Sequence, residues 1–236
     1  MLEIKNLNTN RGSFNLAVTG MRIKPNSVNL ILGPNGGGKT TLLRSIAGLV
    51  EHKGEVILDG VMVNGLNFKD RAKMFGYLSQ GIYLSNTSVR DFLILGRFPY
   101  TSLISRYSRS DWDKVHKAAE VFDIEDYLYR DITTLSQGEL QRVLLAKVFI
   151  QEPKVLLLDE PTTALDMGFK ELVKRQIYKY LEFKPGSSVL ISTHEPNIFI
   201  DRTDDILMLK GGKVFDIGHS SKIYNDGNIK KLFGLS

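Results

Sequence analysis

The chain reads Gly33-Pro34-Asn35-Gly36-Gly37-Gly38-Lys39-Thr40 directly after an apolar run at residues 28–32. This octapeptide fits the pattern G-x-x-x-x-G-K-[ST], in which glycines turn backbone N–H groups toward an anion without interference from a Cβ atom. Lys39 brings a positive charge to the β- and γ-phosphates, and Thr40 offers a hydroxyl to Mg²⁺. A helix is expected from Thr41 onward, with its positive end toward the phosphates. The sequence therefore predicts a nucleoside triphosphate site.

The composition is that of an ordinary globular protein and excludes several kinds of site. Of the 236 residues, 42% are hydrophobic and 24% are charged. The absence of cysteine excludes disulfides, thiolate metal sites and cysteine nucleophiles. No apolar run approaches the roughly 18 uncharged residues of a membrane-spanning helix, and the N-terminus does not resemble a signal peptide. We therefore expect a cytoplasmic protein.

The charge pattern argues against a nucleic acid partner. The formal net charge is +5, but 31 basic residues are interspersed with 26 acidic ones and form no run of five like charges. Residues 92–110 carry Arg but no acid, whereas residues 111–126 hold six acids. This local contrast indicates either a docking face or ordinary surface variation.

The strand patterns predict a sheet with a parallel and an antiparallel part. Continuous apolar runs, typical of parallel strands buried on both faces, occupy residues 155–159 and 188–193. Residues 2–5 and 54–60 read as strands of an antiparallel layer beside the nucleotide loop. A hairpin is expected where Gly211-Gly212 joins residues 206–209 to residues 213–216.

The helical patterns predict a second, helical part of the chain. Apolar residues recur at three- and four-residue spacing from about residue 87 to 130, and helices are expected at residues 140–150 and 168–182. We therefore expect a single α/β domain with a P-loop NTPase core, a mixed, mainly parallel sheet, an antiparallel β-subdomain and a helical subdomain. Residues 1–86 and 151–236 would form the core with its β-subdomain, and residues 87–150 the helical subdomain.

Polar residues end two of the apolar strands. Asp159 and Glu160 follow the first, and His194 follows the second. Ligands of parallel α/β sheets bind at the carboxyl ends of the strands, so these side chains should face the phosphates. Asp159 could hold Mg²⁺ through water, while Glu160 orients or deprotonates a water molecule for in-line attack. The plainer alternatives are a helix N-cap for the two acids and a structural role for the histidine.

A further segment reads Leu135-Ser136-Gln137-Gly138-Glu139-Leu140-Gln141-Arg142-Val143. On its own it predicts a well-capped helix that could bind an anion. Other motifs, in order along the chain, are the P-loop, Asp159-Glu160-Pro161-Thr162, Ala164-Leu165-Asp166 and His194. With this set the chain resembles the ATP-binding-cassette (ABC) ATPases over essentially its whole length. The resemblance implies a protein that binds ATP with Mg²⁺ and hydrolyses ATP to drive transport.

The resemblance also implies a role for each motif. Two copies would bind head to tail with ATP between them, so that Asp166 communicates across the interface. The residues that contact ATP in trans would be Ser136, Gln137, Gly138 and Glu139. Those that contact it in cis would be Gly33, Pro34, Asn35, Gly36, Gly37, Gly38, Lys39, Thr40, Thr41, Arg11 and Phe14. The catalytic residues would be Glu160, His194 and Gln80, and the Mg²⁺ site would comprise Thr40, Gln80 and Asp159.

Membrane partners follow from the same resemblance. It implies integral membrane permease subunits, an extracytoplasmic substrate-binding protein and a position on the inner face of the cell membrane. The segment Leu95-Gly96-Arg97-Phe98-Pro99-Tyr100 and the loop after it resemble importers of iron-siderophore complexes, haem and cobalamin. A zinc or manganese importer, a soluble ATPase of iron–sulfur assembly or repair, and a nucleotide-gated clamp are the alternatives. Because Arg and aromatic residues are enriched in interfaces, we expect a permease helix to dock on Arg97, Phe98, Tyr100 and Tyr107.

Two positions depart from the family pattern. Gln137 occupies a signature position where glycine is usual, which raises the question of backbone freedom there. Arg11 stands where the family generally has an aromatic residue that stacks on adenine. An Arg guanidinium can stack on a base, and Phe14 is close in sequence, so either residue is a candidate for the base platform.

Overall fold

The computed structural model describes residues 1–79, 86–101 and 107–235. Within these residues ten strands form one sheet in the order β5-β4-β1-β2-β10-β9-β3-β8-β7-β6. The strands are β1 (Leu2–Arg11), β2 (Phe14–Ile23), β3 (Val28–Leu32), β4 (Lys53–Leu58), β5 (Val61–Met62), β6 (Phe75–Leu78), β7 (Val155–Asp159), β8 (Ser188–Ser192), β9 (Asp205–Lys210) and β10 (Lys213–His219).

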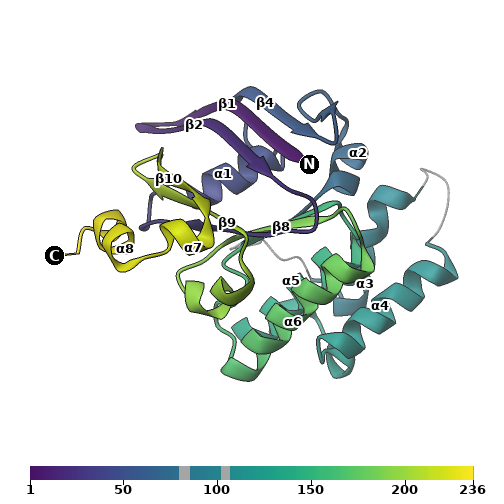
Figure 1. Ribbon diagram of the computed structural model, residues 1–236. Helices are drawn as coiled ribbons and strands as arrows, with labels where there is room; N and C mark the ends of the chain where they lie inside the picture. The colour runs from purple at the N-terminus through teal and green to yellow at the C-terminus, as the bar shows by residue number, and fades with distance from the viewer. Residues whose placement is uncertain (80–85, 102–106, 236) are drawn as a thin grey trace.

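The parallel half of the sheet consists of β9, β3, β8, β7 and β6. Every residue of β3, β7 and β8 is buried, since helices and the antiparallel strands cover both faces (Figure 1). This burial is why these strands read as continuous apolar runs. The predicted strand at residues 155–159 matches β7 in full.

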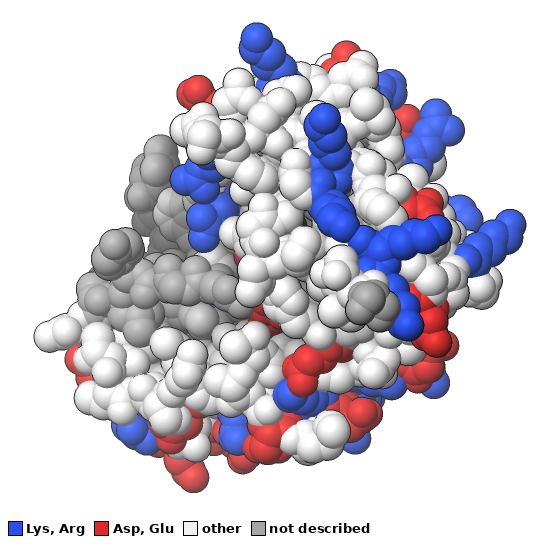
Figure 2. All heavy atoms as spheres, turned by 90° about the vertical axis from the view of Figure 1, so that its left-hand side faces the viewer, with Lys and Arg blue, Asp and Glu red and all other residues white. Residues whose placement is uncertain are grey.

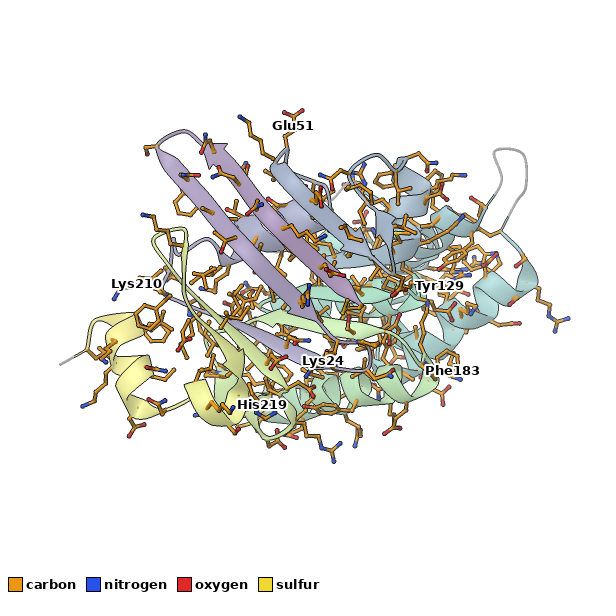
Figure 3. The ribbon with its side chains drawn as sticks, turned by 45° about the horizontal axis from the view of Figure 1, so that its top comes forward. Lys24, Glu51, Tyr129, Phe183, Lys210 and His219 are labelled. Carbon is orange, nitrogen blue, oxygen red and sulfur yellow. The ribbon has the colours of Figure 1, made fainter. Side chains whose placement is uncertain are left out.

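The antiparallel half of the sheet contains β1, β2, β4 and β5, which lie across the parallel strands when the molecule is tilted forward (Figure 3). β1 is longer than the predicted strand at residues 2–5, because hairpin pairing with β2 extends it to Arg11. β4 begins one residue earlier and ends two residues earlier than the strand predicted at residues 54–60. The predicted β9–β10 hairpin is confirmed. Gly211 and Gly212 have φ angles of 55° and 75°, the left-handed conformations that a two-residue hairpin turn requires.

The helices pack on both sides of the parallel strands (Figure 1). Helix α1 lies between the parallel and antiparallel strands, whereas α3, α4, α5 and α6 cover the opposite face. The helices are α1 (Lys39–Ile46), α2 (Phe68–Met74), α3 (Val89–Ile94), α4 (Arg109–Val121), α5 (Gln137–Ile150), α6 (Met167–Phe183), α7 (Ser220–Ile223) and α8 (Asp226–Phe233). Short 3₁₀ turns are η1 (Leu95–Tyr100), η2 (Glu125–Tyr127), η3 (Ile132–Thr134), η4 (Pro196–Ile198) and η5 (Ile200–Arg202).

Two apolar cores hold these layers together. Alternate residues of β7 point to opposite faces, so Leu156 and Leu158 join the core under α5 and α6, while Val155 and Leu157 join the core around α1. On the α5 side, the rings of Phe122, Phe149 and Tyr180 stack edge to face in sequence. These cores fix α1 and α5, the two helices that carry the candidate nucleotide motifs, against one sheet.

Basic and acidic side chains both lie on the surface. On the face shown in Figure 2, Lys and Arg gather in the upper part and mix with Asp and Glu along the lower edge. Among the helices that the structure describes, none combines the length and apolar character needed to cross a bilayer.

Candidate nucleotide-binding and hydrolysis site

The P-loop connects the end of β3 to the start of α1, as predicted. A Cβ atom at Gly33 would lie 2.1 Å from the carbonyl oxygen of Leu209 on β9, so only glycine allows this close approach. Gly38 precedes α1 with a φ of 108°, which a residue with a side chain rarely adopts. The loop is braced by hydrogen bonds from Gly37 N to Pro34 O (3.0 Å) and from Gly212 N to Gly37 O (3.1 Å).

Lys39 lies folded inside the loop. Its Nζ atom donates to the carbonyl oxygens of Gly33 (2.8 Å) and Pro34 (3.4 Å), and the residue is 7% exposed. Burial lowers the pKa of Lys39, whereas the nearby carboxylates of Glu160 and Asp159 act in the opposite direction. The ammonium group is thus held where a phosphate would replace the loop carbonyls as its partner.

An open cleft of about 790 Å³ lies over the loop. Its lining residues are Arg11, Phe14, Asn35, Gly36, Gly37, Gly38, Lys39, Thr40, Thr41, Glu160, Thr163 and His194. Most of the residues predicted to contact ATP in cis are therefore brought together, whereas Gly33 and Pro34 are not among the lining residues. The sequence reasoning missed Thr163, which follows the Asp159-Glu160-Pro161-Thr162 motif and reaches the same cleft.

The two candidates for the base platform face each other on the β1–β2 hairpin. Arg11 and Phe14 are paired residues of this hairpin. Phe14 is half-buried, with its Cζ atom 3.1 Å from where a Cβ of Gly38 would lie, whereas Arg11 is exposed at the rim. Phe14 therefore packs beside the P-loop, whereas the long, exposed side chain of Arg11 can extend over the cleft.

Asp159 is the buried member of the acidic pair and is 1% exposed. Its carboxylate accepts hydrogen bonds from Ser192 Oγ (2.5 Å) and from the hydroxyl of Tyr77 (3.3 Å), which in turn accepts one from Arg44 Nε (3.1 Å). Burial, followed by the charge of Asp159, raises the pKa of Tyr77 to about 12, so the phenol stays a donor. The sequence reasoning did not find these supporting residues.

Glu160 has a left-handed backbone conformation, and one of its two carboxylate oxygens lacks a hydrogen-bond partner within the described residues. Its φ is 53°, in the left-handed region, and its backbone N–H donates to Ser192 O at 3.1 Å. Oε2 accepts a hydrogen bond from the backbone N–H of His194 (3.2 Å), and within the described residues the buried Oε1 has no hydrogen-bond partner. Oε1 lies 3.2 Å from Nε2 of His194, but the two are not aligned for a hydrogen bond.

The protonation states suit proton transfer in the cleft. Burial raises the pKa of Glu160, although the backbone N–H of His194 and the charge of Lys39 oppose the shift. Burial and then the charge of Lys39 lower the pKa of His194, which keeps its imidazole neutral near pH 7. A carboxylate with a raised pKa and a free oxygen is the group expected of a general base.

The signature segment, residues 135–143, supplies the N-cap and the first turns of α5. Ser136 Oγ accepts from Glu139 N (3.3 Å) while Glu139 Oε2 accepts from Ser136 N (2.7 Å), a capping box. The hydrogen bond from the backbone N–H of Ser136 is the largest cause that lowers the pKa of the Glu139 carboxyl group. Gln137 is the first helical residue, so the expected problem of backbone freedom does not arise, and α5 starts three residues earlier than predicted. Residues 136–139 are not among the described residues that line the cleft.

Two other predicted residues have different outcomes. Asp166 is exposed and caps α6, where its Oδ1 accepts from Phe169 N at 3.0 Å. This capping role is compatible with contact to a second copy, because one carboxylate oxygen remains available. Gln80 lies outside the residues that the structure describes.

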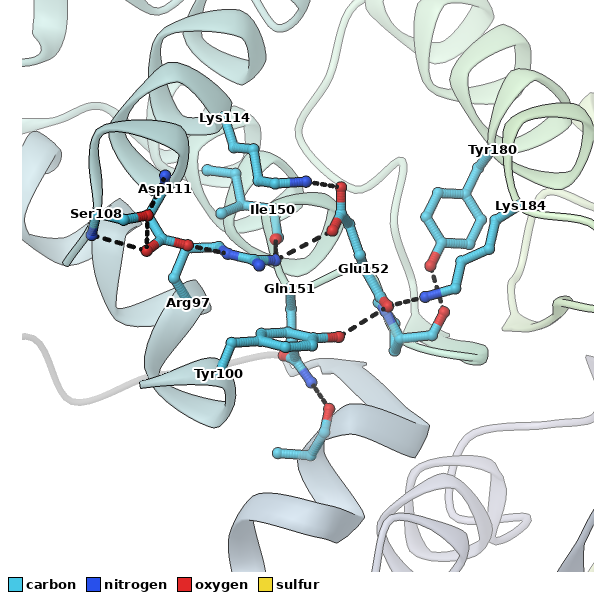
Figure 4. Close-up of polar contacts among 12 residues, drawn as sticks. Arg97, Tyr100, Ser108, Asp111, Lys114, Ile150, Gln151, Glu152, Tyr180 and Lys184 are labelled. Atoms are coloured by element: carbon cyan, nitrogen blue, oxygen red, sulfur yellow. Dashed lines mark hydrogen bonds and ion pairs between the residues drawn. The ribbon is translucent and has the colours of Figure 1, made fainter. Parts of the chain in front are cut away.

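The expected docking role of Arg97 is wrong. Arg97 is 6% exposed: its Nε donates to Asp111 Oδ1 (2.9 Å), and its Nη1 donates to Glu152 Oε2 (3.2 Å) and Ile150 O (2.9 Å). Its guanidinium also stacks on Tyr100 (Figure 4). The charge of Arg97 is therefore neutralised within its own chain, by Asp111 of α4 and by Glu152. Phe98 and Tyr100 remain 40% and 42% exposed, and Tyr107 is half-buried against Trp112.

Comparisons with known proteins agree with this geometry. Residues 16–163 match the family described as ABC transporter. The chain is 33% identical over 224 residues to the petrobactin import ATP-binding protein FpuC of Bacillus anthracis, covering 94% of this chain and 82% of that protein. It is 33% identical over 243 residues to the hemin import ATP-binding protein HmuV of Pseudomonas fluorescens, covering 100% and 93%.

Solved structures show the same fold. The dimeric cassette MJ0796 bound to ADP and Pi has a TM-score of 0.81 and 25% identity, covering 93% of this chain and 99% of that one. An inward-facing ABC transporter of metal-chelate type also has a TM-score of 0.81, at 24% identity, covering 99% and 88%. With P-loop, acidic pair, histidine and signature segment in place on this fold, the chain belongs to the ABC transporter family of ATP-binding proteins.

Proposed function

We propose that this protein is the ATP-hydrolysing subunit of an importer of metal chelates such as iron-siderophore complexes, haem or cobalamin. Two copies would sandwich ATP beneath integral membrane permease subunits, on the inner face of the cell membrane, and an extracytoplasmic binding protein would deliver the cargo. The observation that carries the ATPase assignment is the carboxylate of Glu160, which lines the P-loop cleft and whose buried Oε1 has no hydrogen-bond partner within the described residues. The petrobactin and hemin import relatives support the cargo class.

The residues of the cleft divide the work of hydrolysis. Water attacks the γ-phosphorus in line, the bond to the ADP oxygen breaks, and Glu160 accepts the proton of the attacking water. Lys39 transfers its hydrogen bonds from the loop carbonyls to the phosphates. His194, held beside Glu160, offers a neutral imidazole to the γ-phosphate.

The donors near the loop fit a magnesium ion. Thr40 supplies a hydroxyl at the start of α1 and Asp159 supplies a carboxylate at the end of β7, and Mg²⁺ prefers such oxygen ligands. When bound with ATP, the ion would neutralise charge on the β- and γ-phosphates. Ser192 and Tyr77 hold the Asp159 carboxylate in one orientation for this purpose.

The location of the signature segment supports the head-to-tail dimer. Among the described residues, Ser136 and Gly138 do not line the cleft of their own chain. An anion bound at this helix N-terminus would therefore be a phosphate of the ATP held by a second copy. Asp166, exposed at the start of α6, would lie in the same interface.

The cargo is tested by reconstitution. The protein is combined in liposomes with its permease and binding protein, and ATP-dependent uptake of a ferric siderophore, haem, cobalamin and a phosphonate is compared. A phosphonate belongs in the set because the phosphonates import protein PhnC of Hydrogenovibrio crunogenus is 33% identical over 204 residues. Uptake of one metal chelate is expected, whereas uptake of the phosphonate alone would contradict the assignment.

A further inference from the structure

Helix α5 touches the turn that carries Glu160. The side-chain amide of Gln141, in the second turn of α5, donates from Nε2 to Pro161 O (3.1 Å) and, at the long limit of 3.5 Å, to Glu160 O. Three residues earlier on the same helix face, a Cβ atom at Gly138 would lie 3.1 Å from Ala164 O. The first turns of the signature helix thus rest on the backbone of residues 160–164 of their own chain.

The turn at residues 160–164 is one that needs external support. Glu160 and Ala164 have φ angles of 53° and 63°, and residues with a side chain persist in this region only when their surroundings hold them there. Ser192 holds the N–H side of Glu160, through its carbonyl oxygen (3.1 Å) and its hydroxyl (3.3 Å). Gln141 supports the carbonyl side.

We propose that Gln141 is a positioning residue for ATP hydrolysis. Its side chain links the orientation of the Glu160 carboxylate to α5, the helix that begins with the signature segment of the same chain. The inference rests on the proposed function. Ser136, at the N-terminus of α5, is exposed and placed to meet the ATP of a second copy, whereas Gln141 holds the chain's own catalytic turn five residues further on. ATP bound at the partner's P-loop therefore biases the geometry of Glu160 through α5. Hydrolysis at the two sites is coupled in this way.

The same helix provides a matched control. Gln151, at the C-terminal end of α5, also donates its side-chain amide to two backbone carbonyls, those of Ala72 and Phe75 (2.8 Å to Phe75). Figure 4 shows the amide of Gln151 directed toward a neighbouring helix, and Gln151 is not among the described residues that line the cleft. Replacing either glutamine by leucine removes the same kind of hydrogen bond from the same helix.

The test measures steady-state ATP hydrolysis and melting temperature for Gln141→Leu, Gln151→Leu and the wild type. Gln141→Leu should lower kcat about tenfold or more with KM for ATP within about twofold, since a misplaced catalytic group costs rate rather than binding. Its Hill coefficient for ATP should fall toward 1. Gln151→Leu should lower the melting temperature similarly but keep kcat and the Hill coefficient.

Gln141→Glu separates hydrogen bonding from packing. It preserves the shape of the side chain but turns a carboxylate toward two carbonyl oxygens, and it should lower kcat at least as far as Gln141→Leu. The inference is overturned if either Gln141 variant keeps wild-type kcat and cooperativity, or if both leucine variants lose kcat in proportion to their loss of stability. Neither outcome affects the proposed function. The proposed function is contradicted by a different result, namely a wild-type protein that hydrolyses ATP no faster than the Glu160→Gln variant.

Discussion

The backbone N–H of His194 donates a hydrogen bond to Glu160 Oε2 at 3.2 Å, although the two residues are 34 positions apart in the sequence. The contact follows from the sheet: β7 and β8 are parallel neighbours in which Asp159 pairs with Ser192, so the residues just beyond their ends meet over the P-loop. This register aims one carboxylate oxygen at the histidine backbone. The other oxygen, Oε1, has no hydrogen-bond partner within the described residues.

Glu160 should weaken the fold at neutral pH. Its pKa is raised by burial, so the folded state binds more protons than the unfolded state between the ordinary value of 4.5 and the raised one. Stability therefore falls as the pH rises through that window. Glu160→Gln should melt higher than the wild type at pH 7, and the difference should shrink on acidification. Thermal melts across pH measure this, with the exposed Glu182→Gln as control; an equal or lower melting temperature at pH 7 would count against a desolvated carboxylate.

Arg11 should make the site tolerant of the base. Without an aromatic residue at this position, we expect ATP and GTP to bind within roughly tenfold, a gap of about 1.4 kcal/mol. Competition binding with the two nucleotides measures the ratio, and Arg11→Tyr should widen it in favour of ATP. A preference for ATP above about a hundredfold in the wild type would instead mean that Phe14 forms a discriminating platform.

Arg97 should be essential for stability rather than for docking. Arg97→Ala leaves the carboxylates of Asp111 and Glu152 without their buried partner, and removing one member of such a cluster costs about 3 kcal/mol. Chemical denaturation measures the loss, with the exposed Arg109→Ala as the control. A loss below about 1 kcal/mol, typical of surface ion pairs, would show that the cluster is not structural.

The predicted permease-docking face can be tested at its remaining residues, Phe98, Tyr100 and Tyr107. The chain has no cysteine, so single Cys substitutions at Tyr100 and Tyr107 can be cross-linked to a Cys in the cytoplasmic loop of the permease. Cross-links should form at these positions and be absent from the β9–β10 hairpin. The reverse pattern would move the docking face to the hairpin.

Local sequence patterns predicted the elements that carry the site. Residues 155–158 are apolar because β7 is buried on both faces, and Gly211-Gly212 marks a turn whose φ angles favour glycine. The P-loop residues are contiguous, so their shared function is visible in one stretch of eight. When the residues of a site are contiguous, the pattern of that one segment is sufficient to predict the site.

Contacts between distant segments were not predictable in this way. Tyr77 reaches Asp159 across 82 positions, and Arg97 reaches Glu152 across 55. No periodicity relates such pairs, because the sheet register and the packing of α4 and α5 bring them together. Arg97, read alone in a polar segment, therefore looked like a surface residue, and the amide of Gln141 gave no sign of its partner.

The most direct test of the ATP-sandwich account is the mass of Glu160→Gln by light scattering, with and without MgATP. The substitution removes the proposed general base but spares the phosphate-binding loop, so hydrolysis should fall by ~10²–10⁴-fold while ATP still binds. ATP should then hold the variant as a dimer. Lys39→Ala, which lacks the phosphate-binding charge, should stay monomeric under the same conditions. A Glu160→Gln protein that remains monomeric with MgATP and still hydrolyses it would contradict both the role of Glu160 and the sandwich.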